Sequence, residues 1–199
     1  IRFALAKQIV PIAELLPGAA TAEFMLPVLL AYLDDTAAVV REKAVSVAST
    51  VLINTTKELS WYSEQIVDAL SSIKLLATSH RWSDRRAYVT ISLALAKEVE
   101  QRIVVDELLP LLVMLAEDSV ASVRLALSQF LTEVLQLDPT YLSLPDISAA
   151  INILKATDDA VIRSLLQSAE DSATLAMRMD TLGDGVTSAQ QVQFSPTGL

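Results

Sequence analysis

The stretch that decides the fold is Leu26-Pro27-Val28-Leu29-Leu30-Ala31-Tyr32-Leu33-Asp34-Asp35, because a second copy of it follows later in the chain. That copy begins 83 residues on and runs Leu109-Pro110-Leu111-Leu112-Val113-Met114-Leu115-Ala116-Glu117-Asp118. The proline, the apolar spacing and the closing acid coincide in the two copies. The pair Val40-Arg41 also maps onto Val123-Arg124 at the same offset. A match that extends over both segments indicates an internal repeat.

Arginines indicate the length of the repeat. They stand at positions 2, 41, 85 and 86, 124 and 163, which is a period near 40. The offset of 83 equals two such periods, and a further match of residues 1–10 with residues 123–132, at an offset of 122, equals three. Each period contains two helical patterns. The first helices are expected at 21–34, 61–77, 103–117 and 146–157, and the second helices at 1–16, 37–53, 84–100, 120–137 and 160–180.

Stacking explains why these helices are apolar over so much of their surface. A two-helix unit of about 40 residues cannot bury both of its faces, whereas neighbouring units cover each other and build a continuous interior. We therefore expect an all-α fold: a right-handed α-solenoid of stacked antiparallel helix pairs, with about four and a half repeats. The array is expected to occupy residues 1–182 and to begin with the second helix of a cut repeat, as a fragment of a longer array. Residues 183–199 lose the helical period and are expected to form a flexible tail or linker.

Several residues predict where helices begin, bend and end. The hydroxyls of Thr36, Ser83 and Ser119 stand just before second helices and are expected to cap free main-chain amides. Pro27 and Pro110 stand inside first helices, where a proline removes a hydrogen bond and bends the axis. Pro145 is expected in the first turn of a helix, and Gly183 is expected to end a helix in the left-handed conformation. Met25 and Met114 are expected in the core.

Composition excludes several classes of protein. The 199 residues contain no cysteine and one histidine, so we expect no disulfide framework, thiol chemistry, cofactor or metal centre. A net charge of −9 disfavours binding to nucleic acid or to anionic lipid. The longest apolar run has nine residues, from Leu108 to Ala116, whereas a membrane span needs about 20. We expect no membrane partner and a location in the cytoplasm, with the nucleus as a second compartment.

The repeat resembles the HEAT repeat, within the armadillo-like helical class. The residues that carry the resemblance are the two copies of the first helix, together with the Val-Arg pairs at Val40-Arg41 and Val123-Arg124. In HEAT arrays, aspartates and arginines of this kind form a ladder between neighbouring repeats. Asp35 stands six residues before Arg41, and Asp118 six before Arg124, but no aspartate stands six before Arg85 or Arg86. The ladder is therefore expected to be discontinuous.

Among HEAT proteins, residues 79–86 narrow the resemblance. This segment, SHRWSDRR, is similar to the scaffold subunit of protein phosphatase 2A and to regulatory subunit 1 of protein phosphatase 4. Those scaffolds hold their partners along the turns that join the two helices of each repeat. The resemblance implies that the corresponding turns bind proteins here. They contain Asp34, Asp35 and Thr36; His80, Arg81 and Trp82; Glu117, Asp118 and Ser119; and Asp158 and Asp159.

Each of these turn residues also has a purely structural interpretation. His80 can be a solvated turn residue and Trp82 can cover the local core, although Trp and Arg are also favoured interface anchors. The acidic pairs can cap the helices that follow, since carboxylates favour helix N-termini. They can equally form an acidic ridge that meets a basic partner. Catalysis by Ser79, His80 and Asp84 is not expected, because three residues so close in one turn do not form a base-and-orienter geometry.

These observations predict a non-catalytic scaffold for protein interactions, and not an enzyme. By the resemblance, its partners are a phosphatase catalytic subunit and further regulatory subunits, held near substrates so that effective concentration rises. The alternative is a HEAT-type transport receptor or trafficking adaptor that binds basic peptide signals on an acidic inner surface. The position of the acidic side chains distinguishes the two, because acids on the inner helices favour cargo binding and acids confined to the turns favour the scaffold.

Overall fold

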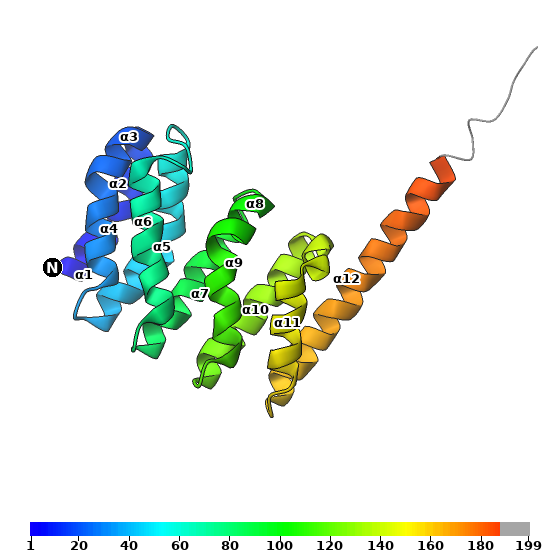
Figure 1. The fold of residues 1–199 in the computed structure, drawn as a ribbon. Helices are drawn as coiled ribbons and strands as arrows, with labels where there is room; N and C mark the ends of the chain where they lie inside the picture. Colours follow the sequence, from blue (N-terminus) through cyan, green and yellow to red (C-terminus); the bar gives the residue numbers. More distant parts are fainter. Residues whose placement is uncertain (188–199) are drawn as a thin grey trace, which may run out of the picture.

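The computed structural model describes the backbone of residues 1–187 and the side chains of residues 1–179. Within residues 1–187 every regular element is helical and no strand occurs. The fold is therefore all-α, as predicted. The helices follow one another in pairs, and Figure 1 shows the pairs side by side in chain order.

The first helices of the pairs are composite. The first pair opens with α3 (Gly18–Ala20), the π-helical η1 (Thr21–Met25) and α4 (Leu26–Leu33). The second has α6 (Glu64–Lys74) and the 3₁₀-helical η2 (Leu75–Thr78). The third has α8 (Gln101–Ile103), the π-helical η3 (Val104–Leu108), α9 (Leu109–Met114) and the 3₁₀-helical η4 (Leu115–Glu117). The fourth is α11 (Pro145–Lys155), preceded by the 3₁₀-helical η5 (Pro139–Ser143).

The second helices are longer and more regular. They are α5 (Ala38–Thr56), α7 (Trp82–Ala96), α10 (Ala121–Leu137) and α12 (Ala160–Thr187). Before the first pair stand α1 (Arg2–Ala6) and α2 (Ile9–Leu15), in place of the single helix expected over 1–16. The break falls at Lys7 and Gln8, because Pro11 has no N–H to donate to the carbonyl four residues earlier.

The second helices contact each other in order. α5 packs on α7, α7 on α10, and α10 on α12, while α4 packs on α5 and α11 on α12. An apolar stripe on α10 is the reason for this packing: Val123, Leu127, Phe130, Leu131 and Val134 are all completely buried. One connected core therefore extends from α2 to α12.

The two prolines inside first helices sit where the helix changes type. Pro27 follows the π-helical segment Thr21–Met25, and Pro110 follows the π-helical segment Val104–Leu108. A π-helical turn rearranges the main-chain ladder where a proline cannot donate, which lets each helix accommodate its proline. Pro145 stands at the start of α11, as predicted.

Three expectations about local structure are wrong. Met114 is 63% exposed and not in the core, whereas Met25 is partly buried against it. Helix α12 passes Gly183 and ends at Thr187, because one glycine inside a long helix costs only about 1 kcal/mol. The hydroxyls of Thr36, Ser83 and Ser119 cap no helix. The rest of the predicted tail, residues 188–199, lies outside the described residues.

Candidate functional site

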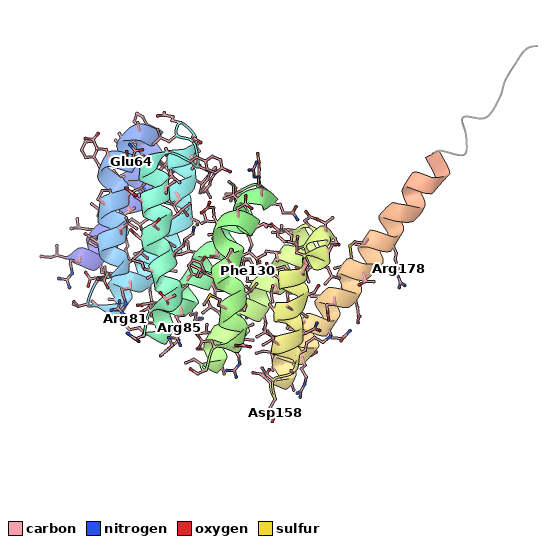
Figure 2. The ribbon with its side chains drawn as sticks, viewed as in Figure 1. Glu64, Arg81, Arg85, Phe130, Asp158 and Arg178 are labelled. Carbon is pink, nitrogen blue, oxygen red and sulfur yellow. The ribbon has the colours of Figure 1, made fainter. Side chains whose placement is uncertain are left out.

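The turns that join the two helices of each pair lie along one edge of the molecule. Figure 1 shows all four at the lower ends of the helices, with the loops between pairs at the upper ends. In Figure 2 the labels Arg81, Arg85 and Asp158 lie along the lower edge and Glu64 near the upper one. We call this row the turn edge, defined as residues 34–37, 79–82, 117–120 and 156–159. It contains every predicted partner-binding residue.

Asp35 joins the first helix pair to α1, and Asp118 joins the third helix pair to the second. Arg2 donates from Nε and Nη2 to the two carboxylate oxygens of Asp35, at 2.6 and 3.2 Å. Arg85 does the same to Asp118, at 2.5 and 2.9 Å. In both cases the arginine stands 33 residues before the aspartate. We call each such bond a rung. A rung joins the aspartate of a turn to an arginine of a helix earlier in the chain, α1 for Asp35 and α7 for Asp118, and the two residues are not the ones that stand six apart.

Both carboxylates also accept the main-chain N–H of the residue that stands just before the next helix. Asp35 accepts from the N–H of Ala37 at 2.7 Å, and Asp118 from the N–H of Val120 at 2.8 Å. The arginine hydrogen bond is the main reason that the pKa of each carboxyl lies below its usual range, and the main-chain N–H adds to this effect. The expectation that these two residues cap the following helices is therefore wrong, because neither α5 nor α10 has a side-chain cap, and their role within the molecule is the bond to arginine. Their oxygens are engaged within the molecule.

A second contact of the arginines recurs at every turn. Nη1 of Arg41, Arg85, Arg124 and Arg163 donates to the carbonyl six residues earlier, at 2.6–2.8 Å. Those carbonyls belong to Asp35, Ser79, Asp118 and Thr157, which are therefore equivalent positions in the four turns. With Nη1 fixed in this way, Nε of Arg85 faces the next turn along the edge.

The second turn replaces the missing aspartate with Asp84 from α7. Ser79 donates from Oγ to Asp84 at 2.8 Å and accepts from the N–H of Arg81 at 3.2 Å, as Asp35 accepts from the N–H of Ala37. Arg81 bonds Asp84 at 2.6 Å and also reaches Asp34 of the preceding turn at 2.8 Å. Asp84 is 3% exposed, with Nε of Arg41 at 3.9 Å. His80 is exposed and takes no part in this cluster, so the three residues do not form a catalytic triad.

The fourth turn has no rung of this kind. Its cap is Asp159, which accepts from the N–H of Val161 at 2.9 Å. At the position of Asp35 and Asp118 stands Thr157, whose Oγ1 donates to the carbonyl of Leu154 at 2.6 Å. Asp158 is fully exposed, with Arg163 at 4.0 Å.

The remaining predicted residues leave their side chains available to solvent. They are exposed and make no side-chain hydrogen bond or ion pair that competes with a partner: Thr36, His80, Trp82, Glu117 and Ser119. With Asp158 they give each turn at least one accessible polar or aromatic side chain. The turn edge therefore has two parts, an inner line of rungs and an outer line of exposed side chains.

Trp82 borders a groove that was not predicted from the sequence. The groove has a volume of about 280 Å³ and lies between α5 and α7. Its walls include Ala38 and Val45 on one side and Trp82, Arg86 and Ala87 on the other. Trp82 is 47% exposed, so it does not simply cover the core. The sequence does distinguish Trp82 from its equivalents. Trp82 stands three residues before Arg85, whereas the residue three before each of the other repeated arginines is alanine, at Ala38, Ala121 and Ala160.

Two other features are absent from the described residues, a cluster of metal ligands and a helix that could span a membrane. Among them, no three His, Asp or Glu side chains gather where a metal ion could bind. Within the same part of the chain, none of the helices has both the length and the apolar character that a bilayer crossing requires. No protein-family model matches this chain, and no curated protein is similar enough to count as a relative. The geometry of the turn edge is therefore the basis for a functional assignment.

Proposed function

We propose that the helix pairs form a right-handed α-solenoid of the HEAT type and that the chain is a non-catalytic scaffold for protein interactions. The main support is that some side chains of the turn edge are paired within the molecule while their neighbours are exposed. Asp35 and Asp118 are occupied by Arg2 and Arg85, which ties each turn to an earlier helix. The neighbouring side chains Thr36, Glu117 and Ser119 remain exposed. A rigid row of exposed side chains suits a protein surface far better than a small molecule.

Trp82 is the strongest anchor in this proposal. Tryptophan and arginine dominate binding energy in protein interfaces when they enter a desolvated pocket. Trp82 stands at the mouth of the groove between α5 and α7, next to exposed Arg86, and His80 lies two residues away. A partner that inserts an apolar side chain beside Trp82 would cover the largest exposed aromatic of the turn edge.

The resemblance of residues 79–86 to phosphatase scaffolds suggests the partner. In the specific form of the proposal, the turn edge holds the catalytic subunit of a protein serine/threonine phosphatase of the 2A or 4 type. The scaffold would act by geometry, since holding the enzyme and its substrate near each other raises their effective concentration. Further regulatory subunits would bind other turns.

The alternative, a transport receptor or adaptor for basic signals, needs an acidic surface on the inner helices. Up to residue 179, five acids stand on the second helices α5, α7, α10 and α12, and they are outnumbered by seven basic residues. Asp84 is buried, Glu133 is paired with Lys97 and Glu170 with Lys155, which leaves Glu42 and Asp171. The acids available to a partner are concentrated at the turns, so the charge distribution favours the scaffold.

The proposal is tested by measuring direct binding. The purified chain is titrated with the purified catalytic subunits of phosphatases 2A and 4, with an unrelated phosphatase of similar size as control. Saturable binding to either catalytic subunit supports the specific form. Absence of binding to both overturns it, and the general scaffold is then tested by crosslinking in extracts followed by mutation of the turn edge.

A further inference from the structure

We propose that Thr157 is a phosphorylation site and that its phosphate completes the missing rung by binding Arg124. This inference concerns the joint between the third and fourth helix pairs and does not depend on the proposed function. It rests on the comparison of equivalent positions within one molecule.

In the two rungs, the position equivalent to Thr157 carries a negatively charged side chain that binds an arginine. Asp35 and Asp118, at the equivalent positions, each accept two hydrogen bonds from the arginine 33 residues earlier. The residue 33 before Thr157 is Arg124. The arginine needed for the rung is therefore present, and only the negative charge is missing.

Arg124 is held in the pose that makes a rung. Its Nη1 donates to the carbonyl of Asp118 at 2.6 Å, just as Nη1 of Arg85 donates to the carbonyl of Ser79 at 2.8 Å. In Arg85 this leaves Nε and Nη2 for the aspartate of the next turn. In Arg124 the corresponding Nε is buried and has no hydrogen-bond partner. Because a buried donor without a partner destabilises the fold, an acceptor supplied here is stabilising.

The second turn shows that a hydroxyl alone does not make this bond. There Ser79 occupies the equivalent position, and the charge that faces Arg41 comes from Asp84, which lies 3.9 Å from its Nε. The residue of α12 that corresponds to Asp84 is Ile162, which is apolar and buried. The fourth turn thus has a hydroxyl at the rung position but no built-in carboxylate to replace an aspartate.

The residues around Thr157 suit a kinase that selects acidic substrates. Asp158 is fully exposed and Asp159 is partly exposed, directly after a partly exposed threonine. A kinase with a basic substrate groove would recognise that pair. In the reaction, Oγ1 of Thr157 forms a bond to the γ-phosphorus of ATP, and the bond from that phosphorus to the β–γ bridging oxygen breaks. ADP leaves with the electron pair, and the hydroxyl proton passes to the base of the kinase.

The phosphate would carry nearly two negative charges at neutral pH and three acceptor oxygens. Charge-assisted bonds to a guanidinium are stronger than neutral ones. The modification would therefore stiffen the joint between α10 and α12, which pack directly on each other.

The structural half of the proposal is tested by thermal unfolding of the whole chain. Phosphothreonine is introduced at position 157 during synthesis, and the same protein is made with Arg124→Gln. Phosphorylation should raise the Tm by about 2–4 °C in the first background and leave it unchanged or lower in the second. Thr157→Asp against its uncharged isostere Thr157→Asn should reproduce the same dependence on Arg124. No rise, or an equal rise without Arg124, overturns the rung.

The modification itself is tested by mass spectrometry. Trypsin cleaves after Lys155 and Arg163, and the peptide between them, ATDDAVIR, has Thr157 as its one hydroxyl residue. Protein isolated from its own cells in the presence of phosphatase inhibitors should contain this peptide with one added phosphate. A peptide found unmodified across growth and stress conditions overturns Thr157 as a phosphorylation site.

Discussion

Arg85 donates two hydrogen bonds to the carboxylate of Asp118, from Nε at 2.5 Å and from Nη2 at 2.9 Å, across the boundary between two helix pairs. The Asp118 side chain is 4% exposed and that of Arg85 is 15% exposed, so water screens this pair weakly. The same aspartate accepts the N–H of Val120, the residue just before α10. One side chain thus fixes both the start of a helix and its distance from the preceding pair.

We predict that Asp118→Asn lowers the free energy of unfolding by about 1–2 kcal/mol at pH 7, because a neutral amide makes weaker bonds to the guanidinium and to the N–H. Glu117→Gln is the matched control, since this neighbouring side chain is exposed. Urea unfolding of the two variants measures the difference. Equal stability of both variants and the parent chain would show that the rung contributes nothing.

The same substitution should alter the response to acid. The pKa of Asp118 lies below its usual range because Arg85 and the Val120 N–H favour the charged form. A group with a lowered pKa stabilises the fold above its unfolded pKa of about 3.9, and this contribution is lost as the pH falls through the folded pKa. The parent chain should therefore lose more stability than Asp118→Asn below about pH 4. Parallel acid titrations followed by circular dichroism test this difference.

Phe130 should be the most sensitive single position in the core of α10. It is completely buried, and Phe→Ala in a core costs about 3–5 kcal/mol. Leu137, on the same helix, is 54% exposed, so Leu137→Ala should change stability by no more than about 0.5 kcal/mol. Chemical denaturation of both variants checks the contrast. Comparable losses would mean that the helix faces are assigned wrongly.

Gly18 is a second position with a clear steric prediction. A Cβ there would lie 2.7 Å from the Thr55 carbonyl oxygen and 3.0 Å from Cβ of Glu58, where α3 approaches the end of α5. Gly18→Ala should therefore destabilise by about 1–3 kcal/mol, although alanine favours helix. Ala19→Ser, at the exposed neighbour, is the control. A more stable Gly18→Ala protein would show that this approach is looser than described.

Alkaline unfolding should depend on two buried tyrosines. Burial raises the pKa of Tyr141 to about 12 and raises that of Tyr88 as well. A raised folded pKa gives stability that is complete below the unfolded pKa of about 10 and is lost as the pH rises through the folded value. Tyr141→Phe should therefore resist alkaline unfolding better than the parent chain. An unchanged alkaline midpoint would contradict the burial of this hydroxyl.

The helix pairs could be predicted because one arginine recurs in each pair, at the same point of its second helix. Arg41, Arg85, Arg124 and Arg163 each stand at the same point of a second helix, with Nη1 on the carbonyl six residues earlier. That short-range contact is set by local geometry. The expected positions of the second helices consequently agree with α5, α7 and α10 to within a few residues at their starts and ends.

The resemblance implied a ladder of aspartates and arginines between neighbouring repeats, but the spacing of six residues did not give the partners in the rungs. Asp35, six before Arg41, binds Arg2 of α1, and the partner of Arg85 lies 33 residues later. The caps were misassigned for a related reason. Thr36 and Ser119 stand one residue before the N-cap positions, which are occupied by Ala37 and Val120, and the aspartates before them accept the N–H of those two residues.

The exposure of single apolar side chains could not be predicted from the sequence either. Met114 has helical spacing from the core residues, yet it lies on the outer side of α9 with 63% of its surface exposed. Trp82 was predicted as an interface anchor, but its groove depends on how α5 approaches α7. Such distances between helices are set by packing over the whole array and are not encoded in any short motif.

The central claim, that the exposed side chains of the turn edge bind a protein partner, is tested most directly by comparing two variants at opposite edges. Trp82 is 47% exposed on the turn edge, and Tyr62 is 62% exposed in the loop between α5 and α6 at the other edge. The affinity of the parent chain, Trp82→Ala and Tyr62→Ala for the phosphatase catalytic subunit that binds it is measured by calorimetry, with unchanged thermal unfolding as a requirement. Our account predicts that Trp82→Ala weakens binding at least about tenfold, a loss of about 1.4 kcal/mol, while Tyr62→Ala leaves it unaltered. Equal affinity of Trp82→Ala and the parent chain, or a larger loss with Tyr62→Ala, would contradict it.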